Sequence, residues 1–364
     1  MPITLPIISL SNVTKKFGDK VVLSNVNMSV YPKEIFGIIG VSGAGKTTLL
    51  RALIGFYDLD FGSIYINNRD VSKSIAVVKR DVGFCTQDGC FYERLTVMEN
   101  LVYFGKMYGL PRKVIEQRAK MLLDMVHLSG DMDTLAKDLS GGMKRRLDIT
   151  CALIHQPQLL ILDEPTVGLD PLLRSQMWKL IHEINKRGTT IIISSHLLGE
   201  IEKMCTRVGI LSDGTIIDVG TPDQLRAKYS HSEEVVLETI PGNYDDLVNR
   251  LRKKGGLIAS VTHREHNLVI YTPHAEAVLR ETLDWVDESK ERLIEVDVNK
   301  PSLAEVFETL MRWREGTKYE EINHLKFSVH HAHRSGFTKE QIRHMLLKKG
   351  WDKKTIEKVL SELP

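Results

Sequence analysis

The chain has 364 residues, of which 42% are hydrophobic and 26% charged, with a formal net charge of +2. This composition is typical of a globular protein, and the near-neutral charge gives no overall field of the kind that marks a nucleic-acid binder, so no nucleic-acid partner is expected. No apolar run is long enough to cross a bilayer, and Met1–Leu10 lacks the features of a signal peptide, so we expect a cytoplasmic protein. The cysteines have no metal-site spacing and are expected to be reduced and mostly buried: Cys85, Cys90, Cys151 and Cys205.

The first region, residues 1–230, alternates between predicted strands and helices. Val21–Val30 alternates weakly between apolar and polar residues, and Glu34–Ile39 is a short apolar run that leads into a glycine. Thr47–Ile54 has the spacing of a helix with one apolar face. A succession of this kind predicts an α/β core.

A glycine-rich segment lies between the predicted strand Glu34–Ile39 and the helix that follows it. It fits the pattern of a glycine, four residues and then Gly-Lys-Ser/Thr: Gly40, Val41, Ser42, Gly43, Ala44, Gly45, Lys46 and Thr47, with Thr48 next. The glycines let main-chain N–H groups surround a β-phosphate, Lys46 reaches the β and γ oxygens, and the Thr47 hydroxyl can bind Mg²⁺. A glycine-rich turn without a ligand is the alternative.

A serine and two glycines stand just before the helical pattern Lys144–Ile154. The segment is Leu139, Ser140, Gly141, Gly142 and Met143. Such a helix N-terminus is an anion site that can hold a γ-phosphate. Taken alone, it is equally compatible with an ordinary capped helix start.

Two carboxylates, Asp163 and Glu164, end the apolar run Leu159–Leu162. Such a run predicts a buried parallel strand whose carboxyl end faces the phosphates. Asp163 is then placed to hold the Mg²⁺ shell, and Glu164 to polarise the attacking water as general base. A solvated strand end is the alternative, and the phosphate-loop pattern upstream makes it the weaker one.

The second region, residues 231–315, has strand and helix patterns in the order of a small split βαβ domain. The predicted elements are a strand, a helix, two strands, a helix and a strand: Glu233–Leu237, Tyr244–Lys254, Leu257–Thr262, Asn267–Tyr271, Ala275–Val286 and Leu293–Val298. A last helix, Ser302–Arg314, has Ser302 as its expected N-cap. No catalytic cluster is evident here, so we expect a role in dimer support or regulation.

The third region, residues 316–364, contains an internal echo in Gly336–Ile342 and Gly350–Ile356. In each copy a glycine and an aromatic residue precede a helix cap, and the pattern predicts one longer helix followed by two short ones. The segment 318–364 carries ten Lys and Arg against six Asp and Glu. It could touch anionic lipid, nucleic acid or a partner protein, but a solvated three-helix bundle resembling ubiquitin-associated folds is favoured. Four histidines lack ligand spacing, and no metal is expected there: His324, His330, His331 and His333.

The phosphate loop, the Leu-Ser-Gly-Gly-Met motif and the paired carboxylates together resemble an ABC ATPase. The resemblance implies an α/β P-loop NTPase fold, with an ABC ATPase core made of RecA-like and helical subdomains. The small α+β split βαβ domain and the three-helix tail follow it. The resulting domain boundaries are 1–230, 231–315 and 316–364.

The resemblance assigns four further positions one by one. Phe17 matches the aromatic residue that stacks on adenine, and Gln87 the glutamine that senses Mg²⁺ and water. Asp170 matches the aspartate of the loop after the carboxylates. His196, which follows the strand-like run Thr190–Ser195, matches the switch histidine that contacts the γ-phosphate. Read alone, Phe17 is as often a core aromatic, Gln87 a surface amide and His196 a capping or packed histidine.

These assignments imply ATP as the nucleotide and Mg²⁺ as the cofactor. The expected catalytic residues are Glu164, His196 and Gln87, and the expected Mg²⁺ ligands are Thr47, Gln87 and Asp163. The family also works as a head-to-tail pair, in which Ser140 of each copy closes over the phosphate held by Lys46 of the other. ATP then holds the pair together, and hydrolysis lets it reopen.

Lys46 and Ser140 share one compact domain, which does not fit the coiled-coil or tandem members of the family. Three segments resemble drug-efflux ATPase subunits related to daunorubicin-resistance exporters: Gly141–Asp148, Pro165–Pro171 and Pro301–Phe307. The resemblance implies an exporter of drug-like or lipid-like compounds, a separate transmembrane permease and a peripheral place on the inner face of the membrane. Asp88–Leu95 is a candidate seat for the permease, or a buried loop. The alternative function is a soluble ABC ATPase that uses ATP-driven dimerisation as a regulatory switch.

Overall fold

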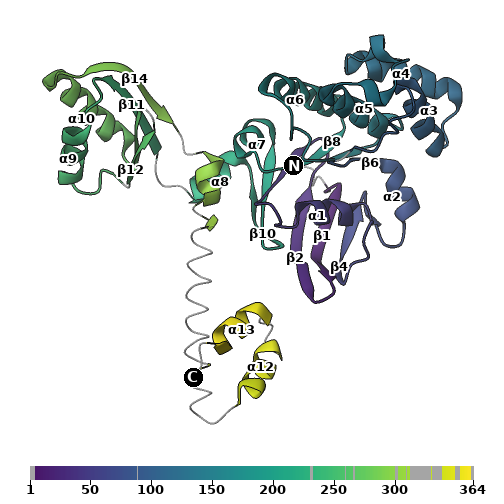
Figure 1. Ribbon diagram of the computed structural model, residues 1–364, viewed down its shortest axis with the longest axis horizontal. Coiled ribbons are helices and arrows are strands. Elements are labelled where there is room, and N and C mark those ends of the chain that lie inside the picture. Colours follow the sequence, from purple (N-terminus) through teal and green to yellow (C-terminus); the bar gives the residue numbers. More distant parts are fainter. Residues whose placement is uncertain are drawn as a thin grey trace. The chain divides into compact units, whose positions relative to one another are not determined.

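The computed structural model describes residues 5–87, 89–229, 233–258, 260–264, 267–299, 302–308, 310–311, 329, 338–348 and 353–361. The chain divides into two compact units, Met1–Leu303 and Ala304–Pro364. The first unit holds an α/β core and a small α+β domain, and the second holds the C-terminal helices (Figure 1). This is the P-loop NTPase architecture that the sequence predicts.

The centre of the core is a six-stranded sheet with the order β10-β9-β3-β8-β7-β6. Its strands are β3 (Ile35–Ile39), β6 (Val82–Cys85), β7 (Leu159–Asp163), β8 (Thr190–Ser195), β9 (Arg207–Ser212) and β10 (Thr215–Gly220). All are parallel except β10, which pairs antiparallel to β9. Every residue of β3, β7 and β8 is buried, which explains their almost continuous apolar sequences.

The register of this sheet brings three chain segments together at one edge. Ile39 pairs with Ser195, and Asp163 pairs with Ser194, so β3, β7 and β8 end side by side. The loops that leave these three strands therefore start next to one another. In a parallel sheet this is the edge where ligands bind.

A second, antiparallel sheet packs against the first. Its order is β2-β1-β4-β5: β2 (Lys20–Val30), β1 (Ile8–Phe17), β4 (Phe61–Ile66) and β5 (Arg69–Asp70). One apolar cluster joins side chains of this sheet with α1 (Lys46–Leu53) and the central strands, including Leu23, Leu49 and Ile192. This packing fixes the direction in which α1 leaves the glycine-rich loop.

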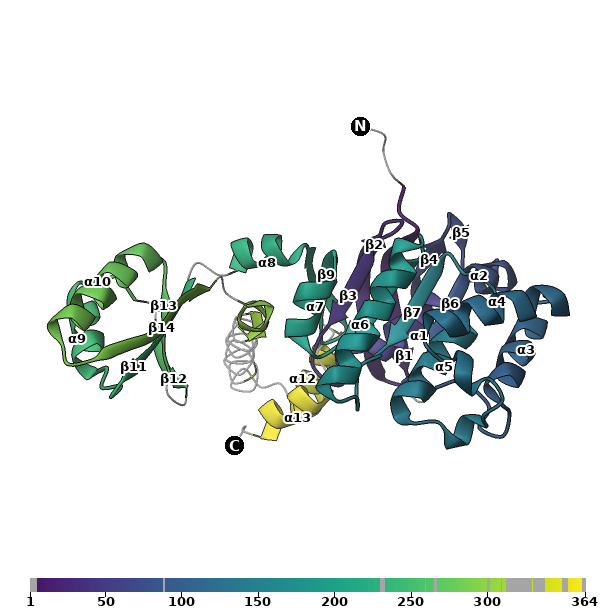
Figure 2. The same cartoon turned by 90° about the horizontal axis from the view of Figure 1, so that it is seen from above.

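Three of the remaining core helices form a group on one side of the core. Helices α3 (Val97–Met107), α4 (Arg112–Met125) and α5 (Gly141–Leu153) gather on the side of the core away from β2 and β10 (Figures 1 and 2). Helix α3 starts with a complete capping box formed by Thr96 and Glu99. The other helices are α2 (Ile75–Asp81), α6 (Pro171–Lys186), α7 (Leu198–Met204) and α8 (Pro222–Tyr229).

The small α+β domain has the element order that the sequence predicts. It consists of β11 (Glu233–Ile240), α9 (Asp245–Lys253), β12 (Ser260–Arg264), β13 (Asn267–Thr272), α10 (Ala275–Glu288) and β14 (Arg292–Asn299). The antiparallel sheet order is β12-β13-β11-β14, so β12 and β14 are its edges. Both helices share a core with the sheet around Trp285, which is 2% exposed. The sequence predicts that this strand starts at Leu257, but β12 starts at Ser260. The chain bends at Gly255 and Gly256, both at positive φ, and Leu257 still belongs to this bend.

The second unit contains the helices α12 (Lys339–Lys348) and α13 (Lys353–Ser361), as the internal echo predicts. Their small apolar core contains Val329, Ile342, Leu346, Ile356, Val359 and Leu360. The predicted helix Ser302–Arg314 is helical wherever it is described from residue 303 on. The longer tail helix and the four histidines at 324, 330, 331 and 333 lie outside the described residues, apart from the helical residue 329.

Candidate nucleotide-binding and hydrolysis site

The glycine-rich loop connects β3 to α1 at the edge where the parallel strands end. Gly45, the residue before α1, has φ +104°, a conformation that favours glycine. A Cβ on Gly40 would lie 2.3 Å from the carbonyl oxygen of Leu211, so only glycine fits there. The Lys46 ammonium donates to the carbonyl oxygens of Gly40 at 2.9 Å and Val41 at 3.3 Å. The loop therefore wraps around the lysine in the way that its sequence motif predicts.

Three ionisable side chains from different elements meet beside this loop. Lys46 comes from the start of α1, Glu164 follows β7, and His196 follows β8. The Lys46 Nζ lies 3.5 Å from Glu164 Oε1, and His196 Nδ1 lies 2.7 Å from Glu164 Oε2. Lys46 and Glu164 are mostly buried, whereas half of the His196 side chain is exposed. The structure thus brings three of the predicted site residues into direct contact.

Ser194 fixes the two neighbouring carboxylates at the end of β7. Its hydroxyl donates to Asp163 Oδ1 at 2.5 Å and accepts from the Glu164 main-chain N–H at 3.0 Å. Glu164 has φ +51°, which is uncommon for a residue with a side chain and is typical of functional sites. The left-handed turn points the Glu164 carboxylate toward Lys46 and His196, while Asp163 stays buried.

A cavity of about 560 Å³ lies over these groups. Its lining contains several predicted nucleotide-binding and catalytic residues: Val22, Ser42, Gly43, Gly45, Lys46, Thr47, Thr48, Gln87, Glu164, Val167 and His196. The other predicted residues lie outside this lining: Phe17, Gly40, Val41, Ala44, Ser140, Gly141, Gly142, Asp163 and Asp170.

The donor set around the cavity suits a small hard cation. Thr47 offers a hydroxyl and Gln87 an amide oxygen in the lining, whereas the buried Asp163 carboxylate lies outside it. Oxygen ligands are those that Mg²⁺ prefers. Within the described part of the chain, no cluster of three or more His, Cys, Asp or Glu could hold a metal on its own.

The serine-glycine motif opens α5 and is not part of the cavity lining. Ser140 is the N-cap of α5, and its hydroxyl accepts from the Met143 N–H at 3.4 Å. Gly142 is buried against the side chain of Leu173, whereas Gly141 is exposed. The first turn of α5 therefore presents serine and main-chain donors outside the Lys46 cavity of the same chain.

Phe17 and Asp170 have definite structural surroundings. Phe17, at the end of β1, is 43% exposed and packs edge-on against Tyr57, with the ring centroids 5.1 Å apart. The Lys15 ammonium lies 5.3 Å from the Phe17 ring centroid. Asp170 is the N-cap of α6 and accepts from the Leu173 N–H at 2.9 Å. Phe17 thus presents an exposed aromatic face to solvent, and Asp170 has a structural role as a helix cap.

Two residues that organise the site have no sequence signal of their own. Ser194 lies inside the predicted strand Thr190–Ser195, where a serine gives no hint that it binds two carboxylate-bearing residues. Arg145 follows the serine-glycine motif in a run of basic residues and donates to four main-chain carbonyl groups. Only the placement of the strands and of α5 reveals these contacts.

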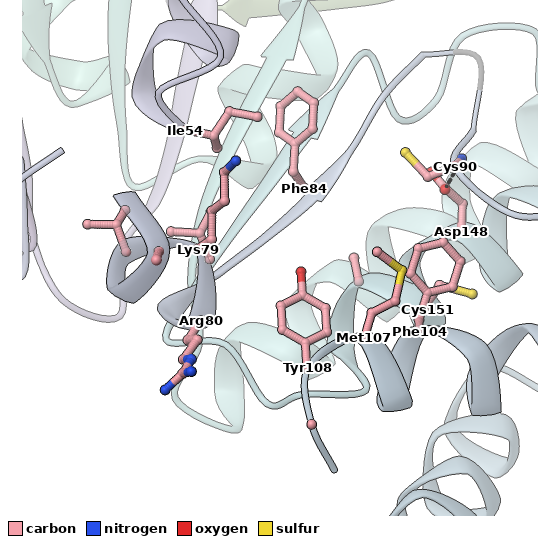
Figure 3. A pocket seen from close by; sticks show the side chains of 15 residues that line it. Ile54, Lys79, Arg80, Phe84, Cys90, Phe104, Met107, Tyr108, Asp148 and Cys151 are labelled. Carbon is pink, nitrogen blue, oxygen red and sulfur yellow. Dashed lines mark hydrogen bonds between the residues drawn. The ribbon is translucent and has the colours of Figure 1, made fainter. Parts of the chain in front are cut away.

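A second cavity of about 530 Å³, the apolar groove, lies between α2, β6, α3 and α5 (Figure 3). Its lining residues are Ile54, Ala76, Val78, Lys79, Arg80, Val82, Phe84, Cys90, Phe104, Met107, Tyr108, Gly109, Asp148, Cys151 and Ala152. Cys90 is the one residue of the candidate seat Asp88–Leu95 in this lining; Phe91 and Tyr92 lie elsewhere, and Asp88 is outside the described residues.

Asp148 is the buried carboxyl of the apolar groove. It accepts from the Cys90 main-chain N–H at 2.7 Å (Figure 3) and lies 3.6 Å from the Arg145 guanidinium. Burial raises the pKa of Asp148 to about 6, although the Cys90 N–H and Arg145 act in the opposite direction. The groove therefore joins an apolar surface to a buried carboxyl group that contacts Arg145.

Comparison with known proteins agrees with this geometry. The ABC transporter family model matches residues 23–167. The linearmycin resistance ATP-binding protein of Bacillus subtilis is 32% identical over 297 residues, which cover 81% of this chain and 95% of that protein. The chain belongs to the ATP-binding proteins of ABC transporters. The Nod factor export ATP-binding protein I of Rhizobium sp. (strain N33) is 34% identical over 300 residues, covering 82% and 95% of the two chains.

Solved structures of ABC transporter ATP-binding proteins have the same fold. The structure of an ATP-binding subunit of an ABC transporter superposes with a TM-score of 0.57 and 30% identity, covering 61% of this chain and 93% of that one. The structure of cbiO1 from Clostridium perfringens, part of the ABC transporter complex cbiONQ, gives a TM-score of 0.57 with 29% identity, covering 61% and 91%.

Membership of this family establishes the activity and the broad setting of the protein. ABC transporter ATP-binding proteins bind nucleotide, hydrolyse ATP and work with membrane partners. Among the described residues, no helix has both the length and the apolar character needed to cross a membrane.

Proposed function

We propose that this chain hydrolyses Mg·ATP in the Lys46 cavity, with Glu164 as the general base. The observation that supports this most directly is the contact of the Glu164 carboxylate with both Lys46 and His196. Thr47, Gln87 and Asp163 are the proposed Mg²⁺ ligands, and Mg²⁺ would supply charge neutralisation on the phosphate oxygens. The main-chain N–H groups between Gly40 and Thr48 bind the phosphates, and Lys46 binds the β and γ oxygens.

Each side chain has a defined task in this reaction. Glu164 takes a proton from the attacking water, and its φ of +51° holds the carboxylate at the end of β7 where that water arrives. His196, hydrogen-bonded to the Glu164 carboxylate at 2.7 Å, orients the base and contacts the γ-phosphate. Gln87 positions the water from the opposite segment. The exposed face of Phe17 receives the adenine ring.

We further propose that two copies act head to tail. Ser140, Gly141 and Gly142 lie outside the Lys46 cavity of their own chain, and an anion-binding helix start of this kind suits the γ-phosphate held by another copy. Asp170, in the loop after the carboxylates, is the proposed contact between copies. ATP then binds the two copies together, and loss of the γ-phosphate releases them.

A complementation experiment tests the paired arrangement. Lys46→Ala and Ser140→Arg each place one defect in every active site, so either protein alone is expected to be inactive. Mixed pairs contain one site with both defects and one intact site. Equal amounts of the two proteins, unfolded and refolded together, should recover about a quarter of the wild-type ATPase rate, because half of the pairs are mixed. No recovery above the separate proteins would contradict head-to-tail pairing.

We propose that the pair powers export through a separate membrane subunit, from a peripheral position on the inner face of the membrane. Two relatives bear names of resistance and export proteins, which favours drug-like or lipid-like cargo. The apolar groove, with Phe84, Phe104 and Met107 in its lining, is a suitable seat for a membrane subunit (Figure 3). A switch that works without a membrane subunit is less favoured, because it gives this groove no occupant.

Co-purification distinguishes these two functions. The motor function predicts that the chain, extracted in mild detergent, retains a multi-span membrane protein that raises its ATPase rate. A complex composed only of water-soluble proteins would support the regulatory switch instead.

We also propose that residues 1–230, 231–315 and 316–364 act as separate domains, the second of them in dimer support or regulation.

A further inference from the structure

Arg145 connects two parts of the hydrolysis site that are far apart in sequence. It lies in the second turn of α5, and its side chain is 10% exposed. Its acceptors are all main-chain carbonyl oxygens: those of Thr86 at 2.6 Å, Asp163 at 2.9 Å, Glu164 at 3.1 Å and Pro165 at 3.1 Å. One guanidinium thus holds the turn 163–165 and the start of the segment that carries Gln87.

The geometry of the arginine side chain explains why a single residue can do this. A guanidinium has five N–H donors in a rigid plane, so it can serve several carbonyl groups at fixed angles. The Nη1 atom points to Thr86, and the Nη2 and Nε atoms point to the turn 163–165. A shift of the main chain of the turn 163–165 relative to that of Thr86 must therefore strain or break at least one of these hydrogen bonds.

The main chain at Glu164 is held from both sides. Its N–H donates to Ser194, and its carbonyl oxygen accepts from Arg145. These two contacts maintain the left-handed conformation that directs the carboxylate. The same helix also holds the Gln87 segment beyond Thr86, because Asp148 accepts from the Cys90 N–H and Lys144 lies 3.7 Å from Glu93.

We propose that Arg145 is a positioning residue for ATP hydrolysis, which sets the Glu164 carboxylate relative to Gln87 by binding both main-chain segments at once. This inference rests on the proposed role of Glu164. It differs from a general stabilising role, because it places the effect of Arg145 on turnover and not on nucleotide affinity. The phosphate-binding loop around Lys46 makes no hydrogen bond with Arg145 in the described structure.

The neighbouring arginine provides a matched control. Arg146 is also partly buried on α5, but it donates to the Val126 carbonyl oxygen at 3.2 Å and to Gln176 at 2.5 Å. Val126 is the C-cap of α4 and Gln176 lies in α6, so neither acceptor belongs to the turn 163–165 or to the Gln87 segment. Replacing either arginine removes one positive charge and partly buried hydrogen bonds from the same helix, four for Arg145 and two for Arg146, but only Arg145 contacts the hydrolysis site.

The experiment measures kcat, KM and the affinity for a fluorescent ATP analogue in the full chain. Arg145→Gln is expected to lower kcat on the order of 10-fold or more with less than about a threefold change in nucleotide affinity, because small misplacement of a base slows chemistry strongly. Arg146→Gln should retain most of the wild-type kcat. Equal kcat values for Arg145→Gln and Arg146→Gln would overturn the proposal.

A second pair of variants distinguishes a defect in folding from an effect on catalysis. If Arg145→Gln does not fold, as judged by circular dichroism, Arg145→Lys and Arg146→Lys replace the glutamine pair, with the same criterion. Loss of folding in both Arg145 variants, but not in the Arg146 variants, would also overturn the proposal in favour of a purely structural role. Wild-type turnover by Glu164→Gln would refute the proposed base itself, independently of the result at Arg145.

Discussion

The Lys46 cavity and the apolar groove have nearly the same size, about 560 and 530 Å³, but opposite linings. The first gathers Lys46, Glu164 and His196 around glycine main chain, and the second is lined mostly by aliphatic, aromatic and sulfur-containing side chains. Volume therefore does not distinguish the two sites; their chemistry does. One is suited to polyanions and proton transfer, and the other to an apolar protein segment.

The two cavities are also neighbours through a single helix. On α5, Asp148 lines the apolar groove, and Arg145 holds the turn that follows β7. The two side chains are one helical turn apart and 3.6 Å from each other. A segment that docks in the groove therefore lies two side chains from the proposed base, and the contrast between the cavities can be tested one cavity at a time.

The largest effect is expected in the Lys46 cavity. Glu164→Gln removes the proposed base but retains a hydrogen-bonding side chain, so kcat should fall by about 10²–10⁴-fold while ATP still binds. The variant should accumulate as a closed dimer with ATP, measured by size-exclusion chromatography. The control is Glu183→Gln, on the exposed side of α6, which should have the wild-type rate. Normal turnover in Glu164→Gln would mean that Glu164 is not the general base, and that hydrolysis in the Lys46 cavity does not depend on this carboxylate.

A second effect concerns Asp148, the buried carboxyl group of the groove. The pKa of Asp148 is about 6 in the folded protein and about 3.8 in the unfolded chain, so folding favours its protonated form. Its contribution to stability is complete at low pH and is lost as the pH rises through 6, a change of about 3 kcal/mol. Asp148→Asn, which stays neutral, should therefore gain stability relative to wild type between pH 4 and pH 7.

Urea unfolding of both proteins at several pH values measures this difference. Asp246→Asn, which changes a largely exposed carboxylate on α9, is the control and should track wild type at all pH values. If the free energy of unfolding of Asp148→Asn differs from that of wild type by a constant amount from pH 4 to pH 7, the pKa of Asp148 is not raised by folding. The Asp148 carboxyl would then be more hydrated than its contacts in the groove indicate.

The smallest expected effect concerns docking in the groove. Met107 lines it and is 67% exposed, so Met107→Asp should fold normally but place a charge where an apolar segment is expected. Retention of the membrane subunit in co-purification should fall by about 10-fold. Met121→Asp, at a 49% exposed methionine of α4 outside the groove, is the matched control. Equal loss in both variants would indicate a general effect of surface charge.

The sequence predicts the elements of this protein better than their contacts. Strand β8 has the predicted bounds Thr190–Ser195, because six buried residues in a row leave little ambiguity. The glycine-rich loop and the paired carboxylates are equally evident, since their chemistry requires fixed residue types at fixed spacing. The element order of the small α+β domain is also as predicted, because short apolar runs mark its strands and apolar residues at helical spacing mark its helices.

Contacts between elements are where prediction from the sequence ends. Arg145 and Arg146 are adjacent and identical in type, yet one binds the turn after β7 and the other binds the C-cap of α4 and a side chain within α6. Nothing local separates them, because a helix turns its successive side chains by 100° toward different neighbours. Ser194 likewise acquires its role only from the register that places it beside Asp163.

The edges of the small sheet limit how two copies of that domain can meet. Strand β14 is one edge, and it carries the charged residues Arg292, Glu295 and Asp297, all exposed. Charges on an edge strand discourage it from pairing with a strand of another molecule. If this domain supports a dimer, its contact is therefore not expected to extend the β-sheet through β14.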